Sequence, residues 1–267
     1  MRKLSTVFIA GLFAMACNND AEKETGSKIK YNELSMEMIK GNVESYEETP
    51  YKTDSAGKPG EMDSCCINVN KIDENGNYVS WMEKDSKGVV KTEVAYSRFD
   101  DGLFKGLKET KAGKPSSSME TQVDDKGVYT TAQEFDSAGK LANYYTNVTM
   151  NEYGQVTGWK QFDKDSVFRQ TGESKFDKTL QTGYIMKDSV GKVKNDNSYK
   201  YNDKGEQTEV SRTNITKDST TTKVTKYTYE SHDEMGNWTQ RTEWDDKGKA
   251  VKVIKRVYTY RKEEEKK

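Results

Sequence analysis

Apolar and polar residues alternate along most of the chain, and a short turn motif separates the alternating stretches. The segments "KVTKYTYE" (223–230) and "VKVIKRVYTYR" (251–261) alternate with period two, which is the pattern of a β-strand. Between such stretches an Asp or Asn is followed three positions later by Gly, as in Asp136–Gly139. These residue types at these positions are typical of a type I turn whose Gly takes a positive φ in a bulge. The pattern therefore predicts a β-hairpin at each copy of the motif.

Ten copies of the turn motif are spread over the chain. They are Asp54–Gly57, Asp73–Gly76, Asp85–Gly88, Asp124–Gly127, Asp136–Gly139, Asn151–Gly154, Asp188–Gly191, Asn202–Gly205, Asp233–Gly236 and Asp245–Gly248. Three degraded copies without the Gly begin at Asp163, Asp177 and Asp218. Alternate copies recur about every 27 residues, which predicts a repeated unit of two strands.

The composition favours thin β-layers over a thick globular core. Hydrophobic residues make up 32% of the chain, well below the roughly 45–50% apolar share of an average domain. The chain nevertheless has 16 Tyr and 4 Trp, and disordered segments have few such aromatic strand formers. We therefore expect an all-β fold, an antiparallel meander of repeated β-hairpins that forms a long twisted open sheet or half-shell.

Two segments resemble a known repeat. "YKYNDKGEQTE" (199–209) and "YTYESHDEMGNWTQRTEWDDKGK" (227–249) are similar to the tyrosine–aspartate (YD) repeats of RHS-type bacterial surface proteins, as they occur in small Bacteroidetes lipoproteins. The resemblance covers roughly residues 34 to 260 and implies a hairpin architecture without an activity. Full RHS proteins wind such hairpins into a closed cocoon, and six or seven hairpins are too few for that, so we expect an open sheet.

The N-terminus has the features of a cleaved export signal. Arg2 and Lys3 precede an unbroken apolar stretch at 7–16, and Cys17 follows small residues. This resembles a bacterial lipoprotein signal peptide, which implies cleavage before Cys17 and acylation of that cysteine. The expected organisation is a signal peptide at 1–16, a flexible tether at 17–30, a β-hairpin repeat domain at 31–260 and a charged tail at 261–267.

The adjacent cysteines Cys65 and Cys66 leave several interpretations open. Neighbouring residues on a strand point to opposite faces, so a bond between them needs a strained turn. The favoured interpretation is two half-buried thiols or a pair without a partner. The alternatives are a vicinal redox switch and an intermolecular bridge.

The sequence offers few groups for catalysis, metal binding or nucleic-acid binding. His232 is the single histidine, so no site built on several histidines is available. The segment 73–77, "DENGN", has oxygen ligands at alternate positions, but its Gly stands fourth rather than sixth as in a calcium loop. Lys plus Arg (43) balance Asp plus Glu (44) without a basic patch. We expect no enzyme activity, no metal, no cofactor and no nucleic-acid partner.

Four serines are candidate modification sites. An Asp-Ser pair followed by a small or apolar residue resembles the O-glycosylation sequon of Bacteroidetes secreted proteins. It marks Ser55, Ser137, Ser166 and Ser189, all at predicted hairpin tips. The alternative is that Ser is simply a good turn residue.

These features together predict a non-catalytic cell-envelope protein for binding or scaffolding. We expect it at the outer membrane, anchored through lipidated Cys17 on the cell-surface or the periplasmic face, with an unidentified protein or glycan partner. One alternative is an immunity or antitoxin-type protein, suggested by the RHS resemblance. Another is a periplasmic carrier of an apolar ligand, although few Leu or Ile are available to line its site.

Overall fold

The computed structural model describes residues 32–100, 102–125 and 127–262. This part of the chain folds into seventeen β-strands and one four-residue helix. The described residues form two compact units. Unit 1 comprises Tyr96–Lys108 and Pro115–Lys223, and unit 2 comprises Asn32–Ala95, Glu109–Lys114 and residues 224–262.

Four strands have residues in both units, and every other element lies in one. Unit 2 contains α2 (Glu33–Met36), β1 (Val43–Thr53), β2 (Pro59–Met62), β3 (Ile67–Ile72), β4 (Tyr78–Lys84), β16 (Trp238–Trp244) and β17 (Ala250–Tyr260). Unit 1 contains β8 (Tyr129–Asp136), β9 (Leu141–Met150), β10 (Val156–Asp163), β11 (Phe168–Asp177), β12 (Leu180–Asp188), β13 (Val193–Tyr201) and β14 (Gln207–Ile215). The strands with residues in both are β5 (Val90–Arg98), β6 (Phe104–Lys111), β7 (Lys114–Val123) and β15 (Thr220–His232).

The turns follow the sequence motif closely. In the β8–β9 turn, the amide of Gly139 donates to the carbonyl of Asp136, and the Asp136 carboxylate accepts from the amides of Ala138 (2.9 Å) and Lys140 (3.0 Å). Gly139 has φ 74°, a conformation that Gly adopts without steric cost. All ten predicted motif copies close with the same pair of backbone hydrogen bonds, so those ten predictions are confirmed.

The degraded copies behave differently from one another. At Asp163 the same turn forms with Ser166 at φ 62° in place of Gly. Asp177 ends β11, and only two residues separate it from β12. The expected turn at Asp218 is wrong, because the hydrogen bond that closes it begins at Thr216. A further turn at Phe99–Gly102 was missed because Phe occupies the position expected for Asp.

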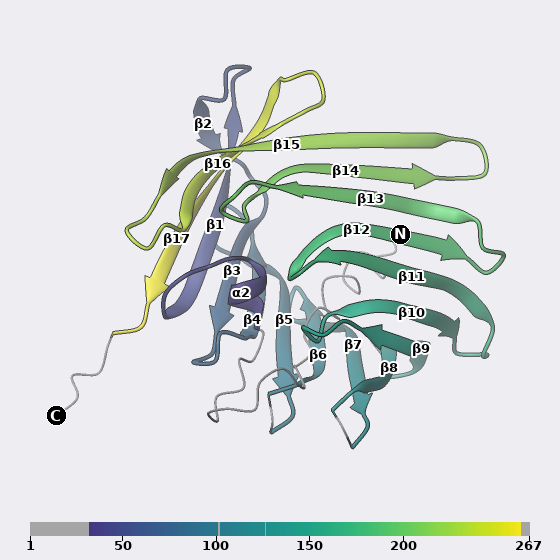
Figure 1. Ribbon diagram of the computed structural model, residues 1–267. Helices are drawn as coiled ribbons and strands as arrows, with labels where there is room; N and C mark the ends of the chain where they lie inside the picture. The colour runs from purple at the N-terminus through teal and green to yellow at the C-terminus, as the bar shows by residue number, and fades with distance from the viewer. Residues whose placement is uncertain (1–31, 101, 126, 263–267) are drawn as a thin grey trace. The chain divides into compact units, whose positions relative to one another are not determined.

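In unit 1, consecutive strands pair in an antiparallel order from β7 to β14 (Figure 1). Each strand therefore neighbours the strands that come directly before and after it in the sequence. Cross-strand aromatic pairs stabilise this arrangement, as expected from the aromatic residues beside the turns. Phe162 stacks on Tyr144 with ring centroids 5.2 Å apart and contacts Phe168 at 5.5 Å.

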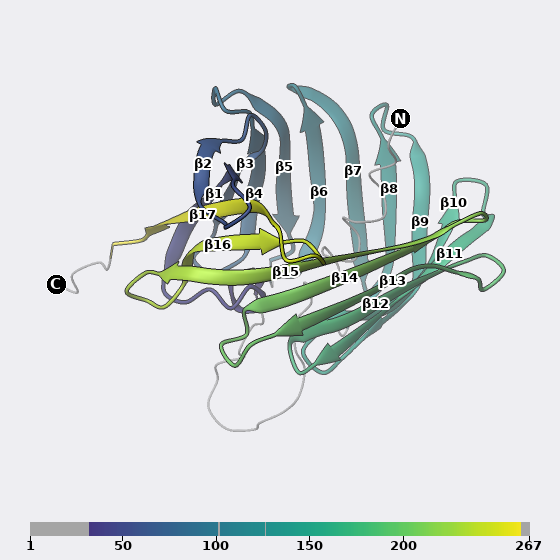
Figure 2. The same ribbon diagram turned by 90° about the horizontal axis from the view of Figure 1, so that it is seen from above.

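In unit 2, β1 pairs with strands from both ends of the chain. Along one side of β1, β17 pairs with it in antiparallel register, with Tyr46 opposite Tyr258 (Figure 2). On its other side β1 pairs with β3 through residues 45–48 and with the short β2 through Tyr51 and Thr53. The strands β2 and β3 therefore share one position beside β1.

The pairing of β1 with β17 overturns the expected open sheet or half-shell. The first and last strands would be the free edges of an open meander, but here they are hydrogen-bonded to each other in one antiparallel sheet. The sheet is closed, with sixteen strand positions, which is the topology of a β-barrel. Closure satisfies the backbone groups that an open sheet leaves unpaired at its edges.

Candidate functional site

The segment that would follow the lipid anchor is built into one end of unit 2. Cys17 and the tether lie outside the described residues. Asn32 is the first described residue, and its side chain accepts from the Ser35 amide (2.9 Å) in a capping box that starts α2. The Asn32 side-chain amide also donates to the carbonyl of Asn75 (2.6 Å), in the turn between β3 and β4. The short helix was not predicted from the sequence.

Apolar side chains bury this segment against the sheet. Leu34 and Ile39 form a cluster with Val43, Tyr46 and Ile72, and each of the five side chains is at most 8% exposed. Burial of one Leu or Ile contributes roughly 1.5–3 kcal/mol. The segment that enters from the tether is therefore part of the core of unit 2.

A second contact joins the same segment to the turn between β15 and β16. The side chain of Asn237 accepts from the Lys40 amide (2.7 Å) and donates to the Lys40 carbonyl (2.8 Å). The same amide group lies 2.8 Å from the hydroxyl of Tyr260. Residues 32–42 thus hold two turns at the end of unit 2 where the chain enters, which we name the anchor end.

A repeated sequence signal marks these two turns. Only Asp73–Gly76 and Asp233–Gly236, among the ten motif copies, are followed by Asn and an aromatic residue, in "DENGNY" and "DEMGNW". The Asn side chains at 77 and 237 are buried. The turn interpretation of 73–77 agrees with the structure, because the Asp73 carboxylate accepts from the amides of Asn75 and Asn77.

A buried arginine lies beside the anchor end. Arg256 is 6% exposed, and its guanidinium contacts the carboxylates of Glu48 (2.6 Å) and Glu37 (3.3 Å). The guanidinium carbon lies 4.0 Å from the ring centroid of Trp238 and 4.4 Å from that of Tyr46. We name these five residues the Arg256 cluster. Glu37 comes directly after α2, so the cluster connects the entering segment to β1, β16 and β17.

The electrostatics of the Arg256 cluster favour a structural role. Burial opposes the charged guanidinium, but Glu48 and Glu37 together raise the pKa of Arg256 well above its usual value. Burial likewise opposes the Glu48 carboxylate, but Arg256 and Arg241 hold its pKa below its usual value. Catalytic acids and bases have pKa values close to the working pH. Both pKa values move away from neutral pH, so Arg256 stays protonated and Glu48 stays ionised.

The sheet of unit 1 has two faces of different character. Its buried face carries Met119, Ala132, Tyr145, Trp159, Tyr184, Met186 and Val210. On this face the Tyr145 hydroxyl accepts from Gln161 (2.7 Å) and donates to Glu134 (3.1 Å). Burial and the Glu134 carboxylate raise the pKa of Tyr145 far above its usual value.

The opposite face of unit 1 is exposed and charged. Lys187 pairs with Glu173 (2.9 Å) on neighbouring strands, and Lys200 pairs with Glu209 (2.8 Å). Lys160 on β10 is exposed on the same face. Strands that face lipid carry apolar residues on that side, because each Lys or Arg at the middle of a bilayer costs about 2–4 kcal/mol. This face is suited to water.

Three of the four candidate glycosylation serines lie at one end of the unit 1 sheet. Ser137, Ser166 and Ser189 are exposed in the β8–β9, β10–β11 and β12–β13 turns, which are alternate turns of the meander. Ser55 is exposed in the β1–β2 turn of unit 2. That turn follows the end of β1 that is opposite to the anchor end. The predicted placement at hairpin tips is correct for all four.

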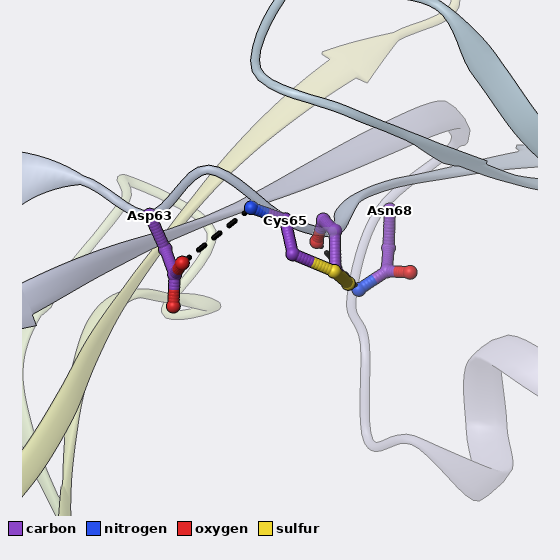
Figure 3. Close-up of a disulfide and its surroundings, with 4 residues drawn as sticks. Asp63, Cys65 and Asn68 are labelled. Carbon is purple, nitrogen blue, oxygen red and sulfur yellow. Dashed lines mark hydrogen bonds between the residues drawn. A yellow bond between two sulfur atoms is a disulfide. The ribbon is translucent and has the colours of Figure 1, made fainter.

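Cys65 and Cys66 are bonded to each other in the structure (Figure 3). The favoured expectation of two free thiols is therefore wrong. The expected difficulty assumed a strand, but the pair lies in the connection between β2 and β3, where Cys66 takes φ 83°. The amide of Cys65 donates to Asp63, and Asn68 donates to the carbonyl of Cys66.

His232 ends β15, and its ring centroid lies 6.5 Å from that of Tyr229. Among the residues that the structure describes, one group of three side chains able to bind a metal lies close together: Cys65, Cys66 and Glu83. The helical segment among the described residues is too short and too polar to cross a membrane.

Comparison with known proteins identifies a fold but no family. No family model and no curated protein matches the sequence. The structure is similar to that of a porin-like protein from Bacteroides uniformis, with a TM-score of 0.52 and 11% identity over 81% of this chain and 96% of that chain. At this identity the likeness shows a shared fold alone, and it agrees with the closed antiparallel sheet.

Two further structures are more distant. A porin-like protein from Bacteroides vulgatus has a TM-score of 0.36 and 10% identity over 81% of this chain and 98% of that chain. A Tc holotoxin pore from Photorhabdus luminescens has a TM-score of 0.29 and 12% identity over 75% of this chain and 13% of that chain. These scores are too low to support an argument. The resemblance to RHS repeats therefore stays a prediction.

Proposed function

We propose that this chain is a non-catalytic cell-envelope lipoprotein whose closed hairpin sheet stands in water beside the outer membrane and serves in binding or scaffolding. The observation that carries the proposal is the charged exposed face of unit 1. It argues against burial of this face in lipid, while the N-terminal sequence supplies a separate means of attachment at Cys17. Several acyl chains on one cysteine give durable anchoring without a membrane-spanning segment.

Charged residues recur on neighbouring strands of the exposed face, so a bilayer would have to bury several of them at once. Lys160, Glu173, Lys187 and Lys200 lie on four neighbouring strands, from β10 to β13. At about 2–4 kcal/mol for each lysine at the bilayer centre, their insertion would cost much of the stability of an ordinary domain. In water Lys187 pairs with Glu173 and Lys200 pairs with Glu209, and the charged side chains keep the surface hydrated.

The anchor end sets how unit 2 would be held. Fourteen residues lie between Cys17 and Asn32, and the flexible tether expected there would have a root-mean-square span of about 20 Å. The turns at 73–76 and 233–236 would therefore stay close to the lipid surface. The β1–β2 turn with Ser55 would point away from it, where a partner or a modifying enzyme has access.

A membrane pore is the second candidate, because the chain shares the closed fold of a protein described as porin-like. The lipoprotein and the pore hypotheses differ in where the protein is found when Cys17 carries no acyl chains. Full-length wild-type protein is expressed in a bacterial host with lipoprotein processing and fractionated, beside a Cys17→Ser variant whose residues 1–16 are replaced by an ordinary cleaved secretory signal. We expect the wild type in detergent-extractable membranes. The variant should be folded and monodisperse in buffer without detergent.

The pore hypothesis makes the opposite prediction for the same variant. If Cys17→Ser protein stays in the membrane after an alkaline carbonate wash, or if purified protein conducts ions in a planar bilayer, the proposal is wrong. Protease shaving of intact cells then separates the cell-surface face from the periplasmic face. Protection of the wild type from added protease would place it in the periplasm.

We also propose O-glycosylation at Ser55, Ser137, Ser166 and Ser189. All four are exposed on turns, and three share one end of unit 1. Intact-mass spectrometry of protein from a host of the resembling bacterial group should show a mass excess that falls with each Ser→Ala change. Ser86 is the matched control, because it occupies the same turn position after Asp85 but precedes Lys87. An unmodified mass would contradict the proposal.

A further inference from the structure

The set formed by Cys65, Cys66 and Glu83 lies in unit 2, where Asn68 stands between Glu83 and Glu48 of the Arg256 cluster in the strand register. The two Sγ atoms and one carboxylate oxygen of Glu83 all lie within 4.8 Å of one another. Cys65 is exposed, and Cys66 and Glu83 are half-buried, so solvent reaches the group. Two cysteine sulfurs and a carboxylate are ligand types that bind a thiophilic divalent cation such as Zn²⁺ or Cd²⁺ once the sulfurs are thiolates.

Backbone contacts hold this group together independently of the bond between the sulfurs. The amide of Cys66 donates to the carbonyl of Lys84 (3.2 Å), the residue after Glu83. The amide of Ser86 donates to the carbonyl of Ser64 (3.3 Å). Asn68, two residues after Cys66, lies opposite Glu83 in the β3–β4 pairing. The cysteine segment is thus attached to β4 at the position where Glu83 projects, and it would remain there after reduction.

The oxidised pair has no thiolate to donate to a metal, because each sulfur is bonded to the other. A dithiol reductant would break this bond in two exchange steps. The two electrons and two protons of the dithiol pass to Cys65 and Cys66, and the reductant becomes a disulfide. Binding of a divalent cation then displaces one proton from each thiol.

We propose that Cys65, Cys66 and Glu83 form a redox-gated site for a thiophilic divalent cation, empty when the cysteines are joined and competent when a dithiol has reduced them. The two thiolates and the Glu83 carboxylate supply three ligands, and water takes the remaining position. The net charge of the three ligands is −3, which suits a divalent cation. This proposal does not depend on the function proposed above.

The test is an anaerobic Cd²⁺ titration of the mature protein in detergent, used once its intact mass shows that Cys17 is acylated. If Cys17 is not acylated, a Cys17→Ser change is made in every protein tested. In either case Cys65 and Cys66 are the only thiols. Equilibrium dialysis measures binding, and the ultraviolet charge-transfer band of Cd–thiolate bonds reports the ligand. We expect one Cd²⁺ per reduced chain and at least about 100-fold weaker binding by the oxidised protein.

Glu83→Gln tests the carboxylate, and Glu93→Gln is its control. Glu93 lies opposite Met82 in the β4–β5 pairing and therefore projects from the other face. We expect Glu83→Gln to weaken binding to the reduced protein by roughly 10- to 100-fold, a range seen even for residues that only support a ligand. Glu93→Gln should bind as the wild type does.

Two outcomes would overturn the proposal. One is binding by the reduced wild type that is no tighter than binding by Cys65→Ser/Cys66→Ser protein. The other is equal affinity of the Glu83→Gln and Glu93→Gln variants. If the double serine variant does not fold, reduced wild type alkylated at both thiols takes its place, and it should lose the charge-transfer band.

Discussion

Unit 1 and unit 2 are stabilised in different ways, although both are built from hairpins. In unit 1 each strand pairs with its neighbours in the sequence, and the side-chain contacts described above join residues 6 to 18 positions apart. In unit 2 the ion pair of Glu48 and Arg256 joins residues 208 positions apart. The repeated turn motif accounts for the pairing of neighbouring strands. The pairing of β1 with β17 is supported by residues such as Glu48 and Arg256, which do not belong to the repeat.

Arg256→Met should have the largest effect and should act on unit 2. The change leaves the carboxylates of Glu48 and Glu37 without their cation, and removal of one partner from a buried ion pair costs about 3–5 kcal/mol. Amide hydrogen exchange should accelerate in β1 and β17 much more than in β10 to β12. Arg212→Met, at an exposed arginine of unit 1, should change stability by less than about 0.5 kcal/mol.

A double variant sharpens this result. Arg256→Met/Glu48→Gln removes the unpaired charge and should recover part of the lost stability. If Arg256→Met has no effect on exchange in β1 and β17, the ion pair does not stabilise the closure, and the contrast between the units fails.

Gly172→Ala should have the next largest effect and should act on unit 1. A Cβ at Gly172 would overlap the indole ring of Trp159 on the neighbouring strand. Insertion of an atom into packed structure costs about 1–3 kcal/mol. Gly183→Ala is the matched control in the next strand, because its Cβ would meet the carbonyl of Asn197 at an ordinary 3.5 Å. Denaturant unfolding of both variants measures the difference.

Substitution of a turn aspartate compares the two units directly. Asp136→Ala in unit 1 removes two hydrogen bonds within its own turn, for an expected cost of about 1–2 kcal/mol. Asp233→Ala in unit 2 also removes a partner of the Tyr260 hydroxyl, so it should cost more. Equal losses in denaturant unfolding would show that the anchor end adds nothing to its turn.

The smallest effect is the pH dependence that the titration of Glu48 gives to the stability. Its pKa is lowered in the folded protein, so its contribution to stability is complete above the ordinary glutamate pKa of about 4.3 and is lost as the pH falls through the folded value. The stability difference between wild type and Glu48→Gln should therefore shrink on acidification. A difference that grows below pH 4 in unfolding experiments would contradict the sign of the shift.

Turns and strands were predictable from the sequence because their causes are local. Asp136 bonds to amides two and four residues ahead, and Gly139 supplies the positive φ, so one short segment contains the whole interaction. The same logic failed at Phe99 and at Asp218, where the first residue of the turn does not follow the motif. The exposed serines were also placed correctly, because they belong to such turns.

Closure and the buried sites were not predictable, because they depend on residues far apart in the sequence. Nothing near Arg256 marks Glu48 as its partner, and the Gly-Asn-aromatic signal of the two anchor-end turns is recognisable only once their shared contact with residues 32–42 is known. The cysteine pair was misjudged for a different reason. Its bond depends on a local departure from strand geometry at Cys66.

The sequence by itself determined the hairpins, their spacing and their antiparallel pairing, since short-range hydrogen bonds and period-two alternation are properties of adjacent residues. The tertiary structure alone decided that the sheet closes, that the segment after the tether is packed into unit 2, and that Glu83 lies beside the two cysteines. Each of these rests on contacts between distant residues, whose free energy depends on packing that no local pattern records.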